Sequence, residues 1–170
     1  PVIFLTGQSS PELDAAVRTA DPGALLVSPR ILRRVIKLDA GIGGIGLRVP
    51  HRKTYVISRD KLLAIVDRAE LDLPPDTELS DTVMLIGRPS AESLSELTPQ
   101  EALTKYWRQL FHARVHRALE ERIAAGKLGA SELANRMAAI GPMEFEEIRL
   151  VLRQEDYLLP PKDDLTVYVE

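Results

Sequence analysis

Short apolar runs alternate with helical patterns in the first half of the chain. The apolar runs are typical of buried strands and lie at residues 2–5, 24–27, 54–57 and 82–86. A serine followed by proline or a charged residue is typical of the start of a helix, and this pattern occurs three times in the first half. It predicts helices at residues 10–20, 31–38 and 58–71. This alternation favours βαβ units. The sequence therefore predicts an α/β fold whose N-terminal half has a mostly parallel sheet of about four short strands.

The second half of the chain carries helical patterns almost throughout. Residues 98–101, which read TPQE, have the form of a capping box with proline at the first helical position. They predict a helix to about residue 125, which Gly126 would end. Further helices are expected at residues 131–139 and 142–156, whereas residues 165–169 alternate like a strand.

These patterns predict three parts along the chain. An α/β subdomain is expected over residues 1–97, and a helical subdomain packed on it over residues 98–159. Residues 160–170 are expected to form an extended tail that begins a further element. Such a tail indicates a part of a larger protein or assembly.

Charge is distributed unevenly on this acidic chain. The net charge is −3, yet residues 30–53 carry seven Lys and Arg against Asp39, a balance of +6 there and −9 elsewhere. A local basic segment on an acidic protein predicts one anionic partner, with nucleic-acid phosphate favoured over an acidic protein. The alternative interpretation is a solvated surface strip. The candidate anion-binding residues of the segment are Arg30, Arg33, Arg34, Lys37, Arg48, Arg52 and Lys53.

The basic segment contains a stretch of six residues with four glycines, which reads GIGGIG at residues 41–46. The spacing satisfies G-x-G-x-x-G, but a dinucleotide fingerprint follows a strand and opens a helix. Here a predicted helix precedes the glycines and an extended segment follows them. We therefore interpret the glycines as a tight connector, while the flanking cations leave a phosphate-wrapping role open.

Polar side chains follow the predicted strands at their C-terminal ends. In a parallel sheet these ends share one edge, where open α/β sheets bind ligands. The sequence thus predicts a second anion site at this edge, unless the serines merely cap helices and the arginines are surface residues. The candidate residues of this edge are Ser28, Arg30, Ser58, Arg59 and Arg88.

Aromatic and apolar residues lie between cations on the predicted long helix. Tyr106, Trp107, Leu110 and Phe111 have helical spacing, and we expect them to pack in the core and attach the helical half to the sheet. Stacking of the aromatic rings on nucleic-acid bases is the alternative.

No constellation of side chains predicts catalysis, a metal or a cofactor. The chain has no cysteine, which excludes disulfides and thiolate sites and fits a reducing, cytoplasmic compartment. His112 and His116 share a helix face, but the general-base glutamate of H-E-x-x-H and a third ligand are missing, so we expect no metal site. No apolar run approaches the length of a membrane span, and we expect no membrane partner.

The favoured hypothesis is a binding or interaction module without chemistry of its own. Its basic segment would contact nucleic acid or another polyanion. A protein partner or the remaining domains of the same chain are further possible partners. One alternative is an enzyme that acts on a phosphorylated small molecule or nucleotide at the sheet edge. The other is a purely structural domain.

Overall fold

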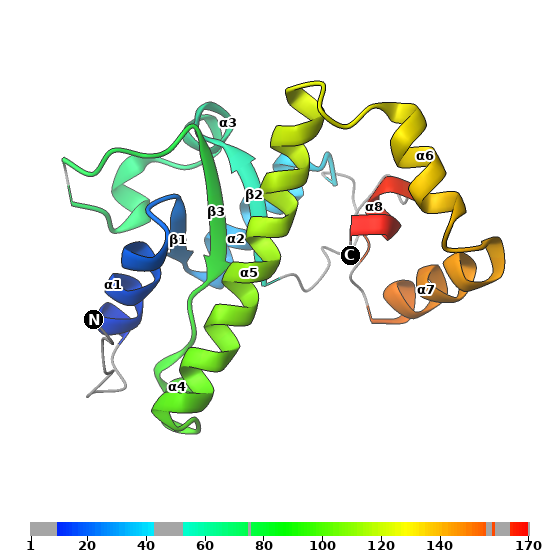
Figure 1. The fold of residues 1–170 in the computed structure, drawn as a ribbon. Coiled ribbons are helices and arrows are strands. Elements are labelled where there is room, and N and C mark those ends of the chain that lie inside the picture. The colour runs from blue at the N-terminus through cyan, green and yellow to red at the C-terminus, as the bar shows by residue number, and fades with distance from the viewer. Residues whose placement is uncertain (1–9, 43–52, 75, 156–157, 159–163, 170) are drawn as a thin grey trace. The chain divides into compact units, whose positions relative to one another are not determined.

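The structure is a computed structural model that describes residues 10–42, 53–74, 76–155, 158 and 164–169 (Figure 1). Strands and helices alternate in its first half, and helices follow in its second half. The strand predicted at residues 2–5 lies outside the described residues. The elements are α1 (Ser10–Ala20), β1 (Ala24–Val27), α2 (Pro29–Asp39), β2 (Thr54–Ser58), α3 (Arg59–Ile65), the 3-10 helix η1 (Arg68–Leu71), β3 (Thr82–Gly87), α4 (Ala91–Ser95), α5 (Pro99–Ala124), α6 (Ala130–Ala138), α7 (Pro142–Gln154) and α8 (Asp164–Val169).

The described strands form one three-stranded sheet in the order β1-β3-β2. β1 is parallel to β3, and β2 is antiparallel to it, as the opposite arrows in Figure 1 show. The α/β class is therefore confirmed, but the prediction of about four mostly parallel strands is wrong for the described residues.

The reversal of β2 follows from the connection between β2 and β3. A parallel crossover must carry the chain back along the whole sheet, but the helix predicted over residues 58–71 is broken, and α3 has only seven residues. Val66 is extended after it, and Asp67 caps η1. The chain then returns to the end it left, where the Arg59 N–H donates to the Asp81 carbonyl over 2.8 Å. Periodicity predicts that a segment is helical and does not predict this return.

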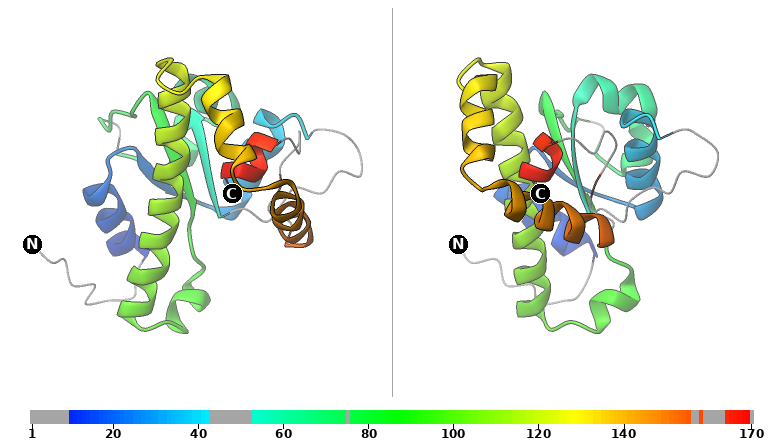
Figure 2. Two further views of the ribbon diagram at one scale, coloured as in Figure 1. Left: turned by 45° about the vertical axis from the view of Figure 1, so that its right-hand side comes forward. Right: turned by 90° about the vertical axis from the view of Figure 1, so that its right-hand side faces the viewer.

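Helices cover both faces of the sheet. Figure 2 shows α5 on one side, and α2 and α3 on the other. Alternate strand residues point to opposite faces, so one set joins α1 and α5 in a buried cluster. The described members of that cluster are Leu13, Val17, Ala24, Leu26, Met84, Ile86, Leu94, Ala102, Tyr106, Leu110 and Ala113.

The aromatic segment of α5 packs only in part as the sequence predicts. Tyr106 and Leu110 are buried, but Trp107 is 40% exposed and Phe111 is 70% exposed. Neighbouring helical residues point about 100° apart, so both members of each adjacent pair cannot face the sheet. The expectation that Trp107 and Phe111 lie in the core is therefore wrong.

The described residues form two compact units, one from those within 10–36 and 53–117 and the other from those within 37–42 and 118–169. The first unit contains the sheet. The second contains a small cluster around Phe145, Leu158 and Val167, and the Arg149 guanidinium lies 5.5 Å from the centre of the Phe145 ring.

The end of the second unit differs from its prediction. Residues 165–169 belong to α8, not to an extended strand, because Val167 packs on the small cluster and Asp164 pairs with Arg149 of α7. A mostly apolar run of five residues does not separate strand from helix. Among the described helices, none combines the length and the apolar character needed to cross a bilayer.

The capping box of α5 is confirmed. The Glu101 N–H donates to Thr98 Oγ1 over 3.3 Å, and the Thr98 N–H donates to Glu101 Oε2 over 2.8 Å. Thr98→Ala is therefore expected to lower the free energy of unfolding by about 1 kcal/mol, because one amide at the helix start loses its acceptor. Urea unfolding followed by circular dichroism measures this change.

The matched control is Thr104→Ala in the same helix. Thr104 is exposed, and its hydroxyl donates only to the Gln100 carbonyl, which lies 2.8 Å away. Removal of this hydroxyl should change the free energy of unfolding by no more than about 0.5 kcal/mol. Equal effects of the two substitutions would contradict a stabilising role for the capping box.

Candidate functional site

The predicted strand-end residues do not share one edge of the sheet. Val27 pairs with Gly87, so Ser28 and Arg88 leave the sheet at the same end. Ser58 instead pairs with Thr82, at the start of β3, and lies at the opposite end. The antiparallel direction of β2 therefore separates Ser58 and Arg59 from the other predicted residues.

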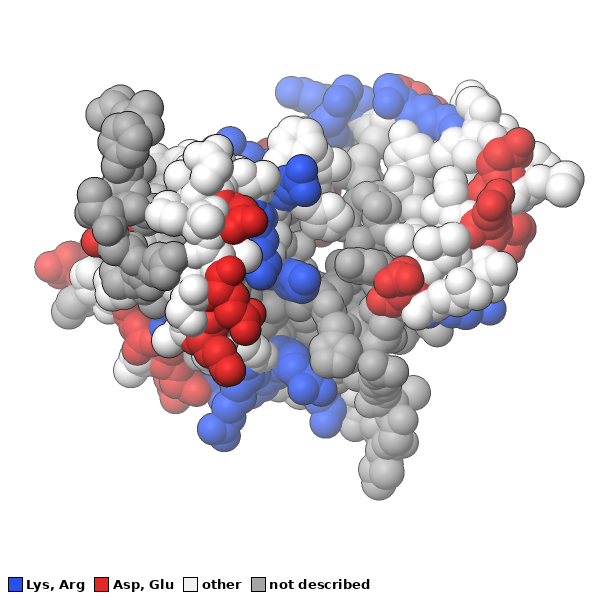
Figure 3. Space-filling view, turned by 90° about the horizontal axis from the view of Figure 1, so that it is seen from below, with Lys and Arg blue, Asp and Glu red and all other residues white. Residues whose placement is uncertain are grey.

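The same reversal brings Lys53 to the end of the sheet where β1 and β3 finish. The Gly87 N–H donates to the Lys53 carbonyl over 2.8 Å, and the Lys53 side chain is exposed. α2 begins at this end, directly after Ser28, and carries Arg30. Figure 3 views the molecule from this end, where basic and acidic side chains lie next to one another.

Arg88 is held by protein groups on several sides. Its Nη1 donates to Asp72 Oδ2 over 3.0 Å, and its Nη2 donates to the Leu26 carbonyl over 3.2 Å. Nη2 also lies 3.4 Å from Asp14 Oδ2. Burial raises the pKa of Asp14, and the positive charge of Arg88 opposes that rise. Two carboxylates already lie beside Arg88, so its side chain links α1, β1 and the end of η1. It is therefore not an open anion-binding group.

Ser28, Ser58 and Arg59 are placed for local structural contacts. Ser28 Oγ accepts the Ile31 N–H over 3.3 Å and so helps to cap α2. Ser58 is the residue before α3, although its side chain makes no capping hydrogen bond. The Arg59 Nη1 lies 3.1 Å from Asp81 Oδ1 and also donates to the Leu79 carbonyl.

The basic segment forms one side of the amphipathic helix α2. Arg30, Arg33 and Lys37 are exposed, and within the described residues none of them makes a hydrogen bond or an ion pair. Their spacing of three and four residues places them on one side of the helix. The apolar side of α2 is buried through Ile31, Leu32, Val35 and Ile36.

Arg34 differs from its neighbours because it has an acidic partner. Its Nη2 lies 2.7 Å from Glu70 Oε2, and this hydrogen bond is the main reason that the pKa of Glu70 is lowered. Glu70 also accepts the Asp67 N–H over 3.2 Å. Arg34 therefore joins α2 to η1. Arg48 and Arg52 lie outside the described residues.

The first glycine of the GIGGIG stretch ends α2. Gly41 has a φ of 66°, its N–H donates to the Leu38 carbonyl, and the Ile42 N–H donates to the Lys37 carbonyl over 2.9 Å. This pair of bonds is a Schellman motif, in which a left-handed glycine satisfies the last helical carbonyls. Ile42 is buried. The connector interpretation is confirmed for Gly41, and the other three glycines lie outside the described residues.

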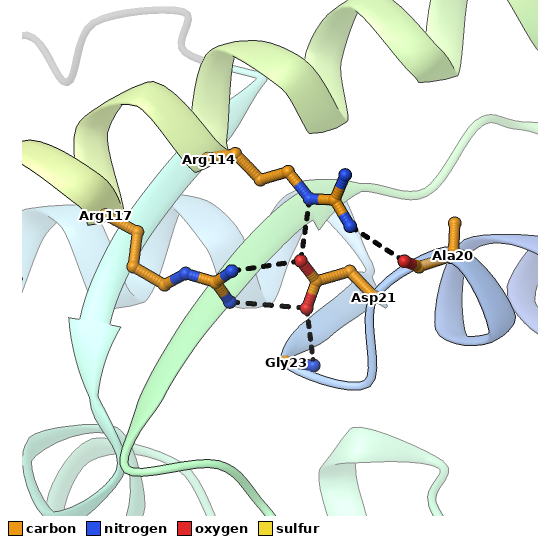
Figure 4. Close-up of polar contacts among 5 residues, drawn as sticks. All are labelled: Ala20, Asp21, Gly23, Arg114 and Arg117. Atoms are coloured by element: carbon orange, nitrogen blue, oxygen red, sulfur yellow. Dashed lines mark hydrogen bonds and ion pairs between the residues drawn. The ribbon is translucent and has the colours of Figure 1, made fainter.

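A buried carboxylate that the sequence analysis did not single out lies between α1 and α5. Asp21 is 5% exposed and accepts Arg114 Nε over 2.8 Å and Arg117 Nη1 and Nη2 over 3.2 and 3.1 Å (Figure 4). The Gly23 N–H adds a fourth hydrogen bond at 2.9 Å. Arg114 also donates to the Ala20 carbonyl over 2.7 Å.

The arginines keep Asp21 ionised in its buried position. Burial by itself would raise the pKa of Asp21, but the hydrogen bonds from Arg114, Arg117 and the Gly23 amide outweigh it and lower the pKa. Both carboxylate oxygens already accept hydrogen bonds, so Asp21 is not placed to act as a general base. The cluster fastens the turn between α1 and β1 to α5.

His112 and His116 approach each other on the flank of α5. Their Nε2 atoms lie 3.0 Å apart, and their rings meet edge to face with centroids separated by 4.6 Å. No third His, Asp or Glu joins them to complete a metal-binding group within the ranges that the structure describes. The expectation of no metal at this pair stays a prediction.

No protein-family model matches the chain, and neither a curated protein nor a solved structure matches it.

Asp21→Asn is expected to lower the free energy of unfolding by about 2 kcal/mol at pH 7, because it removes charge-assisted hydrogen bonds from two arginines. The pKa of Asp21 is depressed in the folded state, so its contribution is fully present above the ordinary aspartate pKa of about 3.9 and is lost as the pH falls through the folded-state value. Urea unfolding measures the free energy of unfolding of the unaltered protein and of the variant at pH 7 and at pH 4 and below. The difference between the two free energies should become smaller in acid.

Asp81→Asn is the matched control. Asp81 also pairs with an arginine, but its side chain is 93% exposed. Removal of its charge should change the free energy of unfolding by less than about 1 kcal/mol. Equal stability of the two variants at pH 7 would contradict the role given to Asp21.

Proposed function

We propose that this chain binds a polyanion, with nucleic-acid phosphate favoured, through the exposed cations of α2. These cations, Arg30, Arg33 and Lys37, are named here the α2 basic face. The observation that carries the proposal is their common side on a helix whose opposite side is buried. Because the helix is fixed by its buried side, its backbone holds the three cations outward and needs no further ordering when an anion binds.

Within the described residues no ion pair involves a cation of the α2 basic face, although the charge of Arg30 contributes a little to the lowered pKa of Glu70. Arg34, the fourth cation of the helix, is the one that pairs with Glu70. The first turn of α2 contains no acidic residue, so the positive end of the helix dipole adds to the charge of Arg30. Lys53 adds a further exposed cation at the end of the sheet from which α2 starts. An anion would lower the electrostatic energy of this arrangement.

An extended polyanion fits the α2 basic face better than a small phosphate does. Arg30 and Lys37 are seven residues apart, which is about 10 Å along a helix. Duplex DNA carries a phosphate charge for about each 1.7 Å of its axis, so several charges fall within that span. A small phosphate needs donors that converge on one point, and three cations in a row on a helix do not converge.

The alternatives stay predictions with weaker support. An enzyme acting at the sheet edge would use Arg30, Arg59 and Arg88, but Arg59 and Arg88 already face carboxylates and leave opposite ends of the sheet. In a purely structural domain, the exposed cations of α2 would be only a solvated surface strip. A measurement of polyanion binding separates this alternative from the proposed function.

The triple substitution Arg30→Gln, Arg33→Gln and Lys37→Gln is expected to weaken binding to a labelled oligonucleotide and to flatten its salt dependence. For each phosphate that the variant no longer neutralises, the slope of log K against log salt should fall by about 0.9 for duplex DNA and by about 0.7 for a single strand. Fluorescence anisotropy at several salt concentrations, with duplex and single-stranded probes, measures both quantities. Stability should change little, because all three side chains are exposed.

A charge-matched control is the triple substitution of Arg122, Lys127 and Arg153 by Gln. These side chains are also exposed, and both triples change the net charge from −3 to −6. If binding depends on the α2 basic face, the control keeps most of the salt slope. Equal reductions would mean that net charge alone attracts the probe, and absence of binding by the unaltered protein at low salt would refute the proposal.

A further inference from the structure

An exposed apolar ridge runs along the side of α5 that faces away from the sheet. Trp107 is 40% exposed, Phe111 is 70% exposed and Val115 is 44% exposed. They are four residues apart, which lines them up on one helix face, while Tyr106 and Leu110 are buried on the other. We name these three residues the α5 ridge. Large apolar side chains that line up in this way, unlike scattered ones, are typical of a surface for docking.

The margin of the α5 ridge is basic. Arg108 is exposed and Lys105 is half-buried, and neither makes an ion pair within the described ranges. Both line an open depression of about 340 Å³ on the same helix. The acid beside them, Glu101, is already engaged by Thr98 in the capping box. The ridge therefore favours a partner whose apolar side chains are accompanied by carboxylates.

Helix α7 has an exposed surface of that complementary kind. Met143 is 82% exposed, Leu150 is 53% exposed and Val151 is 50% exposed. Glu144 and Glu147 are exposed on the same helix, and Glu147, four residues after Met143 and three before Leu150, lies on the same face as these two. Val151 points about 100° away from Leu150 and forms the margin of this face. We name the three apolar residues the α7 ridge. α7 thus has apolar residues on an outer side, although its inner side packs in the small cluster of the second unit.

The two ridges match in length and in charge. Trp107 to Val115 and Met143 to Val151 each span eight residues, or about 12 Å of helix. The basic margin of the α5 ridge would meet the carboxylates of α7. This complementarity favours pairing of α5 with α7 over pairing of two like-charged surfaces. Two α5 ridges packed antiparallel about Phe111 would instead bring Arg108 beside Arg114 of the other copy. We propose that the α5 ridge of one copy of this chain docks against the α7 ridge of a second copy.

A contact of this size predicts a weak, concentration-dependent association. One pair of short helix faces buries less than the roughly 1,600 Å² of a standard interface. Most of the binding energy should come from the two aromatic side chains, because buried Trp and other large anchors dominate such contacts. The association should weaken with salt, because its charged margins are exposed.

Trp107 reports directly on this contact because it is the only tryptophan of the chain. In the unassociated protein it is partly exposed, and docking would bury it. Its emission should shift to shorter wavelength as the protein concentration rises, in parallel with an increase in mass measured by sedimentation or light scattering. A monomer at all accessible concentrations, with unchanged emission, would overturn the proposal.

Substitutions on both ridges test which surfaces meet. Phe111→Asp and Leu150→Asp should each raise the dissociation constant about thirty-fold or more. Leu63→Asp is the matched control, because Leu63 is also an exposed apolar residue (40%) but lies on α3, and it should leave association unchanged. Circular dichroism of each variant verifies that the fold is kept.

A charge reversal separates the proposed pairing from other uses of the α5 ridge. Arg108→Glu and Glu147→Arg should each weaken association, and the double variant should recover part of the affinity. Self-association that Leu150→Asp does not weaken would exclude α7 as the occupant. An oligonucleotide that changes the Trp107 emission of a protein that stays monomeric would assign the ridge to base stacking and overturn the proposal.

Discussion

The pairing of β3 with a parallel β1 on one side and an antiparallel β2 on the other decides which charged side chains come together. Because Val27 pairs with Gly87 and Ser58 pairs with Thr82, residues that follow β1 and β2 leave opposite ends of the sheet. The same direction of β2 brings Lys53 to the end at which α2 starts. The structure therefore does not have the predicted cluster of arginines at one sheet edge. It has a basic face on one helix, α2, instead.

The cations fall into two groups: those that form ion pairs and stabilise the fold, and those that face the solvent. Arg34 pairs with Glu70, Arg88 lies between Asp14 and Asp72, and two arginines of α5 enclose Asp21. Each of these contacts joins elements that are distant in sequence and occupies its arginines with a carboxylate, although Arg114 and Arg117 share the single charge of Asp21. The exposed cations of α2 have no such partner in the described part of the chain, and they are the groups whose charge is available to a ligand.

The sequence predicts burial and helix boundaries better than it predicts direction or side-chain partners. The strands at 24–27, 54–57 and 82–86 are confirmed, as is the TPQE capping box, because apolar runs and caps are local signals. The direction of a strand depends on the end of the sheet to which the preceding connection returns the chain. Hydrophobic periodicity carries no information about that end. Asp21 finds its arginines 93 and 96 residues away, and no pattern in one sequence indicates such a pair. On α5, the spacing of Trp107 and Phe111 resembles that of their buried neighbours, so the pattern places them wrongly in the core.

The central claim is that a polyanion meets α2 and not the ends of the strands. A titration of isotope-labelled protein with a short oligonucleotide, followed by backbone amide chemical shifts, tests it most directly. The account predicts that the largest changes fall on residues 30–37 and on Lys53, with small changes at Arg59 and Arg88. Changes centred on Arg59, on Arg88 or on the exposed side of α5, with residues 30–37 unaffected, would contradict it.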